Sequence, residues 1–185
     1  YANDIEESAC RIFEENFGVI PDRRDIRTVP ASEIPEIDVL TGGFPCQSFS
    51  IVAQNPKRLG YKDERGMLFF EMCRILREQQ PKCFIAENVK GILTANNKAA
   101  FPLIIKEFEN SGYDVKYTVL NAAEYGVPQK RERVIIVGFR KDLKINFTFP
   151  EPSITSETQY EALQSVIDTE VDEKEVVAED AVTEV

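Results

Sequence analysis

The sequence predicts an α/β domain with a mostly parallel sheet, because short apolar strands alternate with amphipathic helices over residues 1–150. Short apolar strands that alternate with helices are typical of a mostly parallel sheet. A chain of 185 residues, 43% of them hydrophobic, can bury one core of ordinary size. Beyond residue 150 the pattern is lost, so we expect one domain over 1–150 and an acidic extension over 151–185.

Three helices are predicted from apolar residues at helical spacing. The first covers 5–17 and ends at Gly18, a residue suited to a left-handed C-terminal cap. The second carries its apolar stripe over 68–76 and must end before Pro81. The third runs over about 98–110. Each is long enough to cover part of a sheet.

The predicted strands fall between these helices. Short apolar runs predict strands at 37–42 and 83–86, and strands near 113–120 and 133–139 complete the domain. The chain opens at Tyr1 without an initiator methionine, and its first residues look like the end of a strand already under way. We therefore expect a piece of a longer protein.

The net charge of −10 is distributed unevenly. Residues 151–185 hold eleven acidic residues and one lysine, which leaves 1–150 with 21 residues of each sign. Within this neutral part the basic residues cluster in two places, and each cluster fits either a solvated face or a contact with a polyanion. They are Lys57, Arg58, Lys62 and Arg65, and then Lys130, Arg131 and Arg133.

The chain has no histidine, and its four cysteines form no CxxC pair. The usual zinc sites and every nucleophile relay based on histidine are therefore excluded, and we expect no metal. No apolar run is long enough to cross a bilayer, and the N-terminal residues do not resemble a secretory signal. We expect a cytoplasmic protein without a membrane partner.

One cysteine, Cys46, stands on a bend rather than in an apolar run. Gly42 and Gly43 come at the end of the predicted strand at 37–42 and let the backbone leave the sheet steeply, while Pro45 fixes the backbone just before the thiol. A reactive thiol and a small buried side chain are both compatible with this string. Without histidine, a nucleophilic Cys46 needs a cation, a helix N-terminus or its substrate to activate it.

Other candidate groups lie at the ends of other strands. Glu87 follows the apolar strand at 83–86, so Cys46 and Glu87 come at the carboxyl ends of two strands, where α/β proteins place their sites. Arg131 and Arg133 alternate ahead of the last strand and share one face of it. They could hold Glu87 or an anionic ligand, or could brace a loop.

Three linked motifs then resemble those of the cytosine-C5 DNA methyltransferase family, in the form found in bacterial restriction-modification enzymes. They occur in the family's order and approximate spacing, and the strings between them match over nearly all of residues 1–150. The motifs are Pro45-Cys46-Gln47, Glu87-Asn88-Val89 and Gln129-Lys130-Arg131-Glu132-Arg133.

The resemblance implies a catalytic mechanism. The enzyme would flip a cytosine out of the duplex, and Cys46 would add to its C6 as thiolate. Glu87 would contact N3 and the exocyclic amine, stabilising charge that develops on the ring. Arg131 would position the base and support the adduct, whereas Arg133 would brace Glu87. Loss of the C5 proton would then release the methylated product.

The resemblance also assigns residues around the thiol. Pro45 and Asn88 would be structural, with Asn88 fixing the loop that carries Pro45. The segment 44–66 would close over double-stranded DNA, with Gln47 and Ser50 near the vacated base and the backbone. Its lysines and arginines would meet phosphates.

The implied methyl donor is S-adenosylmethionine, bound in a Rossmann-like domain. Asp4 matches the acidic residue that holds the ribose hydroxyls. The other matching positions surround the adenine and line the remainder of the site. They are Ile5, Asp25, Ile26, Gly43 and Leu68.

Departures from the family pattern bear on what the chain can do alone. The glycine-rich segment that normally precedes Tyr1 and the target-recognition domain are absent, so the domain is expected to be truncated at both ends and inactive by itself. Residues 151–185 match at best the start of the recognition region. The resemblance further implies a monomer in a bacterial or phage setting, with a restriction endonuclease as a functional, not physical, partner.

Two alternatives stay open at this point. A few members of the family modify transfer RNA, which would change the substrate and keep the chemistry. The chain could also act as a binding module without catalysis, because without the glycine-rich loop its affinity for the cofactor could be negligible.

Overall fold

Four strands form the sheet of the computed structural model, which describes residues 1–45 and 67–153. The strands are β1 (Val39–Gly43), β2 (Cys83–Val89), β3 (Tyr113–Asn121) and β4 (Glu132–Arg140), in the spatial order β1-β2-β4-β3. β1 and β2 pair in parallel, with Val39 opposite Cys83 and Gly43 opposite Glu87. The α/β class predicted from the sequence is confirmed.

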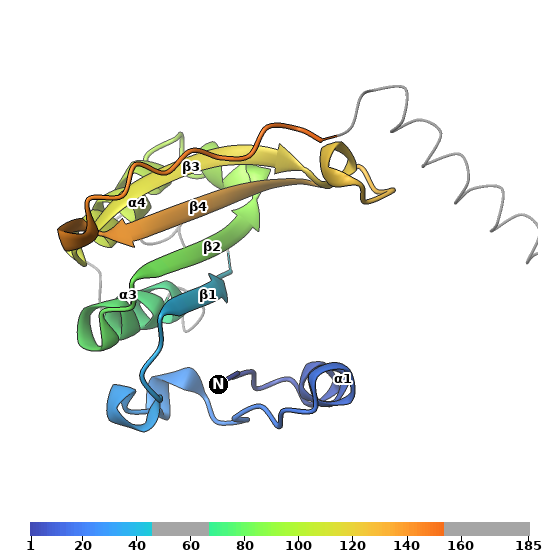
Figure 1. Cartoon of the computed structure of the whole chain (residues 1–185), viewed down its shortest axis with the longest axis vertical. Helices are drawn as coiled ribbons and strands as arrows, with labels where there is room; N and C mark the ends of the chain where they lie inside the picture. The colour runs from blue at the N-terminus through green and yellow to red at the C-terminus, as the bar shows by residue number, and fades with distance from the viewer. Residues whose placement is uncertain (46–66, 154–185) are drawn as a thin grey trace, which may run out of the picture. The chain divides into compact units, whose positions relative to one another are not determined.

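β4 runs against the other three strands (Figure 1). Its last residue, Arg140, donates its N–H to the carbonyl of Lys82 just before β2, over 3.0 Å. Lys141 makes the equivalent bond to Gly112, just before β3, also over 3.0 Å. Both bonds join the end of β4 to the start of a neighbour. Three strands thus share one direction, and the sheet is mixed.

The helices lie close to their predicted ranges: α1 is Glu7–Phe17, α3 is Met67–Gln79 and α4 is Ala100–Asn110. Gly18 caps α1 in the left-handed region with φ 65°, as predicted. Short 3₁₀ turns, which the sequence pattern did not predict, occupy several connections. They are η1 (Ile26–Thr28), η2 (Ala31–Glu33), η5 (Lys90–Leu93), η6 (Ala122–Tyr125) and η7 (Lys141–Leu143).

The described chain divides into two compact units. Unit 1 comprises Tyr1–Tyr117 and Val134–Phe147, and unit 2 comprises Thr118–Arg133 and Thr148–Val185, of which 154–185 lies outside the described residues. The expected division into 1–150 and 151–185 stays a prediction.

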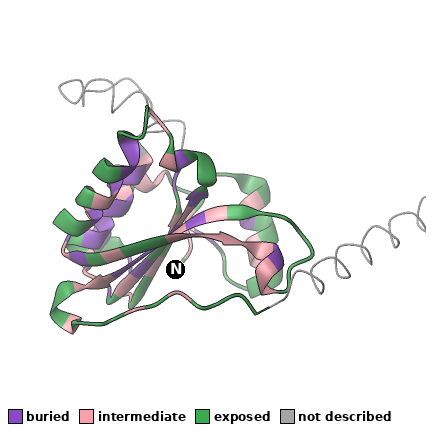
Figure 2. Ribbon diagram, turned by 90° about the horizontal axis from the view of Figure 1, so that it is seen from above, coloured by how far each residue is buried: buried purple, intermediate pink, exposed green. Residues whose placement is uncertain are grey.

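Aromatic rings form the centre of unit 1. Phe84 of β2 lies 4.5 Å from Phe108 of α4 between ring centroids, and Phe108 lies 5.2 Å from Phe69 of α3. The rings are tilted or edge-on, the arrangement that aromatic pairs prefer. Phe44, just after β1, stacks edge-on to Phe69 at 5.1 Å. Both helices therefore pack on the face of β2 that carries Phe84, and Figure 2 colours the buried residues of the ribbon purple and the exposed ones green.

Two glycines that were expected to end the first strand instead continue it. Gly42 and Gly43 both belong to β1. A Cβ at Gly42 would lie 3.2 Å from the sulfur of Met72, so this glycine allows α3 to approach closely. The space beside Gly138 of β4 is smaller still, since a Cβ there would lie 2.1 Å from Phe84. The glycines serve packing rather than a turn.

The apolar stripe of α1 behaves differently from those of α3 and α4. Among its residues Cys10 is fully buried, whereas Ile12 is 56% exposed and Phe17 is 67% exposed. The helix was correctly predicted from spacing, yet most of its apolar face is uncovered. No described helix is long and apolar enough to cross a membrane.

Candidate active site

The carboxyl ends of β1 and β2 bring two predicted site residues side by side. Gly43 and Glu87 are register partners, and a Cβ on Gly43 would lie 3.6 Å from Oε2 of Glu87. The sequence placed Glu87 just after its strand, but β2 continues to Val89, so Glu87 lies within it. Regular backbone pairing therefore holds Glu87 opposite Gly43. Cys46 follows Gly43 by three residues along the chain.

Asn88 connects the two strand ends on the opposite face of β2. Its Nδ2 donates to the carbonyl oxygen of Phe44 over 2.7 Å, and its Oδ1 accepts from the N–H of Val89 over 2.9 Å. Only 4% of Asn88 is exposed. A buried amide with both ends bonded to backbone holds its partners in one geometry. The backbone is thus fixed immediately before Pro45.

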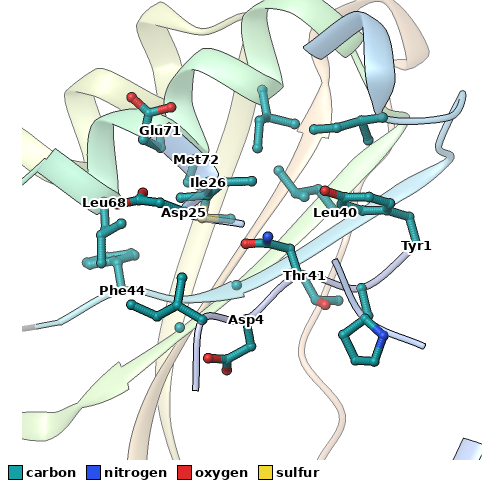
Figure 3. A pocket seen from close by; sticks show the side chains of 18 of the residues that line it. Tyr1, Asp4, Asp25, Ile26, Leu40, Thr41, Phe44, Leu68, Glu71 and Met72 are labelled. Atoms are coloured by element: carbon teal, nitrogen blue, oxygen red, sulfur yellow. The ribbon is translucent and has the colours of Figure 1, made fainter. Parts of the chain in front are cut away.

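A cavity of about 900 Å³ opens beside β1 in unit 1 (Figure 3). Its volume falls within the range of pockets for small molecules and cofactors. Its wall comes from the first residues of the chain, the η1 turn, β1 with Phe44 and Pro45, and α3. All six residues predicted to bind the cofactor line it: Asp4, Ile5, Asp25, Ile26, Gly43 and Leu68.

Carboxylates and apolar side chains share this wall. Asp25 accepts from the N–H of Arg27 over 2.9 Å and from its guanidinium over 2.5 Å. The Arg27 hydrogen bonds lower the pKa of Asp25, so this carboxyl stays ionised. Asp4 accepts from the N–H of Glu6 over 2.9 Å. The wall can offer anionic acceptors beside the apolar surface of Ile26 and Leu68.

Arg74 of α3 fixes the η1 side of the cavity, a role that sequence reasoning missed. Its guanidinium donates to the carbonyls of Ile26 over 3.2 Å and Val29 over 2.9 Å, while Glu71 accepts from its Nε over 2.7 Å. A basic residue on an amphipathic helix ordinarily reads as solvent-exposed, and its backbone acceptors lie more than forty positions earlier. No local signal predicts that pairing.

The arginine motif lies in unit 2, where the backbone of Arg131 is held at both ends. Its N–H donates to Oδ1 of Asn121 over 3.1 Å, and its carbonyl accepts from the N–H of Ala122 over 3.0 Å. Arg133 donates from Nη1 to the carbonyl of Glu132 over 2.9 Å. The bracing of Glu87 by Arg133 stays a prediction.

Several predicted residues lie outside the described residues. They are Cys46, Gln47 and Ser50, together with the rest of the segment 46–66 and its basic cluster. Within 1–45 and 67–153, no group of three or more histidine, cysteine, aspartate or glutamate side chains could hold a metal ion.

Comparison with known proteins gives a consistent result. A family model described as C-5 cytosine-specific DNA methylase matches residues 1–184. Type II methyltransferase M.NgoFVII of Neisseria gonorrhoeae is 46% identical over 155 residues, which is 83% of this chain and 41% of that protein. Type II methyltransferase M.FnuDI of Fusobacterium nucleatum is 47% identical over 160 residues, covering 86% of this chain and 46% of that protein.

A solved structure extends the likeness to the fold. A DNA modification methyltransferase encoded within an E. coli prophage superposes with a TM-score of 0.64 at 26% identity, over 80% of this chain and 41% of its own. The chain spans about half the length of the curated relatives it matches.

Proposed function

Because the chain belongs to the C-5 cytosine-specific DNA methylase family, we propose that its protein transfers a methyl group from S-adenosylmethionine to C5 of a cytosine flipped out of duplex DNA. The observation that carries this proposal is the joint position of a cavity and a carboxylate. The cavity of about 900 Å³ runs along β1 as far as Gly43 and the residues that lead into Cys46, and Glu87 is the register partner of Gly43. Methyl donor and base would meet there.

The cavity suits the chemistry of S-adenosylmethionine, the methyl donor of DNA methyltransferases with this fold. Asp4 would accept from the ribose hydroxyls, and the ionised Asp25 would accept from the adenine edge. Ile5, Ile26 and Leu68 would contact the apolar faces of the ligand, and Gly43 leaves room for it at the strand end. When bound, the cofactor supplies an electrophilic methyl group.

Cys46 would attack the base. Its thiolate adds to C6 of the flipped cytosine, which makes C5 nucleophilic, and elimination across C5 and C6 later expels the thiolate as the C5 proton leaves. Asn88 supports this step indirectly, because its bond to Phe44 fixes the backbone two residues before the thiol. Pro45 limits the remaining freedom.

Glu87 would act as the partner of the ring. Its carboxyl group hydrogen-bonds N3 and the exocyclic amine, where charge changes as the thiolate adds. Arg131 would hold the base and the adduct, and Arg133 would brace Glu87. Gln47 and Ser50 would contact the DNA near the vacated position, within a segment 44–66 whose basic residues meet phosphates.

The setting of this activity follows from the same resemblance. We propose a monomer in a bacterial or phage-infected cytoplasm, paired in function with a restriction endonuclease that cuts the unmethylated sequence. No physical contact with that nuclease is required, because both enzymes read the DNA independently.

Covalent trapping tests the proposal. The whole protein is incubated with S-adenosylmethionine and a long mixed-sequence duplex carrying 5-fluorocytosine, whose fluorine blocks the final elimination. We expect a protein–DNA adduct that survives denaturing electrophoresis. Cys46→Ser should abolish it, whereas Cys83→Ser, which removes a half-buried thiol elsewhere, should leave it unchanged. Equal trapping by Cys46→Ser would refute the nucleophile, and trapping on transfer RNA alone would refute the substrate.

A further inference from the structure

The side chain of Asn121 bridges the two ends of the loop between β3 and β4. Its Oδ1 accepts from the N–H of Arg131 over 3.1 Å and from the N–H of Ala123 over 3.4 Å. The N–H of Ala122 donates to the carbonyl of Arg131 over 3.0 Å. One amide therefore joins the start of the η6 turn to the residue where the loop returns.

From this geometry we propose that Asn121 is a positioning residue for Arg131. The inference rests on the proposed function, in which Arg131 holds the flipped base. Both backbone hydrogen-bonding groups of Arg131 are occupied, one by the Asn121 side chain and one by its neighbour Ala122. Because the backbone of Arg131 is fixed, its side chain extends from a defined Cα position. The guanidinium therefore loses fewer conformations when the base binds.

The returning part of the loop lies outside the packed core. Residues 126–131 are all exposed, and Asn121 itself is half-buried. Other backbone bonds inside the loop join Gly126 and Val127 to the carbonyl of Ala122 and Gln129 to the carbonyl of Val127, and none of these involves Arg131. Because residues 126–131 lie outside the packed core, removing the Asn121 acceptor should loosen the backbone at Arg131 without disturbing that core.

The opposite side of η6 supplies a matched control. The hydroxyl of Tyr125 donates to the carbonyl of Pro150 over 3.0 Å, and the N–H of Ser153 donates to the carbonyl of Glu124 over 3.0 Å. These bonds anchor residues 150–153 on the same turn but do not involve Arg131. Tyr125→Phe therefore removes a hydrogen bond of similar exposure from η6 and leaves the Asn121 contacts intact.

The test measures the rate of trapping on 5-fluorocytosine DNA by the whole protein. We expect Asn121→Ala to slow trapping about 10- to 100-fold at saturating DNA, since small misplacements of a positioned group cost about that much. DNA affinity should change less than the rate. Asn121→Asp keeps an acceptor for both N–H groups and should restore most of the rate. Tyr125→Phe should trap at the wild-type rate.

A second variant shows whether Asn121 acts through Arg131. Once Arg131→Ala is present, adding Asn121→Ala should slow trapping no further, because the group that it positions is already gone. Losses that multiply would overturn the inference, as would wild-type trapping by Asn121→Ala. A wild-type protein that does not trap overturns the proposed function itself. We also expect faster amide hydrogen exchange at Arg131 in Asn121→Ala. This measurement reports the hydrogen bond between Asn121 and Arg131 independently of activity.

Discussion

Two asparagines fix two functional segments, and they do so in opposite surroundings. In unit 1, Asn88 is 4% exposed and donates its side-chain N–H to the carbonyl of Phe44. In unit 2, the half-buried Asn121 accepts the backbone N–H of Arg131. One segment leads to the proposed nucleophile and the other carries the proposed base-holding arginine. An asparagine side chain therefore hydrogen-bonds the backbone of each segment, once inside the core and once near water.

The surroundings decide what each hydrogen bond contributes. When the buried donor of Asn88 is removed, its hydrogen bond to the Phe44 carbonyl is lost in a place that water does not easily reach, which costs about 1–3 kcal/mol. When the acceptor at Asn121 is removed, water can bond the exposed N–H of Arg131, so the net loss in stability from that bond is small. We expect the first contact to matter for folding and function together, and the second to matter for geometry alone.

The largest expected effect tests whether the core around Asn88 is as rigid as this contrast requires. Gly138→Ala would place a methyl group against Phe84, which shares the buried face of β2 with Asn88. We expect a loss of about 3 kcal/mol in the free energy of unfolding, because backbone and ring must both move. Chemical denaturation measures it.

The control is Gly91→Ala, since a Cβ at Gly91 would meet no atom within 4 Å. That variant should change the free energy of unfolding by less than about 1 kcal/mol. If Gly138→Ala were equally mild, the β2–β4 core would be adaptable, and the contrast between the two asparagines would lose its basis.

The next effect compares the two asparagines directly. Asn88→Ala should lower the free energy of unfolding by about 2 kcal/mol, whereas Asn121→Ala should lower it by less than about 1 kcal/mol. Thermal or urea unfolding of both variants gives the two values under one set of conditions. Equal losses would mean that burial does not decide how much each hydrogen bond contributes to stability. A larger loss in Asn121→Ala would mean that the loop contact contributes more than the buried one.

The smallest effect concerns an ion pair at the cavity wall, Asp25 with Arg27. The pair lowers the pKa of Asp25, so its stabilisation is present above the unfolded pKa of about 3.9 and is lost as the pH falls through the lower folded value. Asp25→Asn should therefore be less stable than wild type near pH 6, by less than Asn88→Ala.

Urea unfolding at several pH values checks this sign. The difference between wild type and Asp25→Asn should shrink as the pH falls below about 4. A difference that is constant with pH would assign the effect to packing or to neutral hydrogen bonds rather than to the charge.

Much of this arrangement could be predicted from local patterns. Apolar runs located β1 and β2, and the rule that sites gather at the carboxyl ends of strands placed Cys46 and Glu87 after neighbouring strands. The pairing of Gly43 with Glu87 shows that the described ends of these strands are neighbours. The continuation of β2 through Glu87 and Asn88 was not predicted, because polar residues inside a strand look like the start of a loop. Here the neighbouring strand supplied the pairing that the local sequence did not indicate.

Contacts over long sequence separations escaped prediction for a different reason. Arg74 reaches backbone carbonyls in and just after η1, and backbone acceptors carry no residue signature. The exposed stripe of α1 shows that spacing predicts a helix without saying what covers it. Asn121 could have been found, because Asn121 followed three positions later by Glu124 is a typical helix-start pattern. That signal predicts its bond to Ala123 but not its bond to Arg131.

The adjacency of Glu87 and Asn88 ties chemistry to strand register. Successive residues of a strand point to opposite faces, so sliding β2 by one position against β1 would turn Glu87 into the aromatic core and Asn88 out of it. A misregistered chain would bury a carboxylate and lose the Phe44 bond in the same event. Folding errors that would misdirect the carboxylate are therefore disfavoured by the same pairing that builds the core.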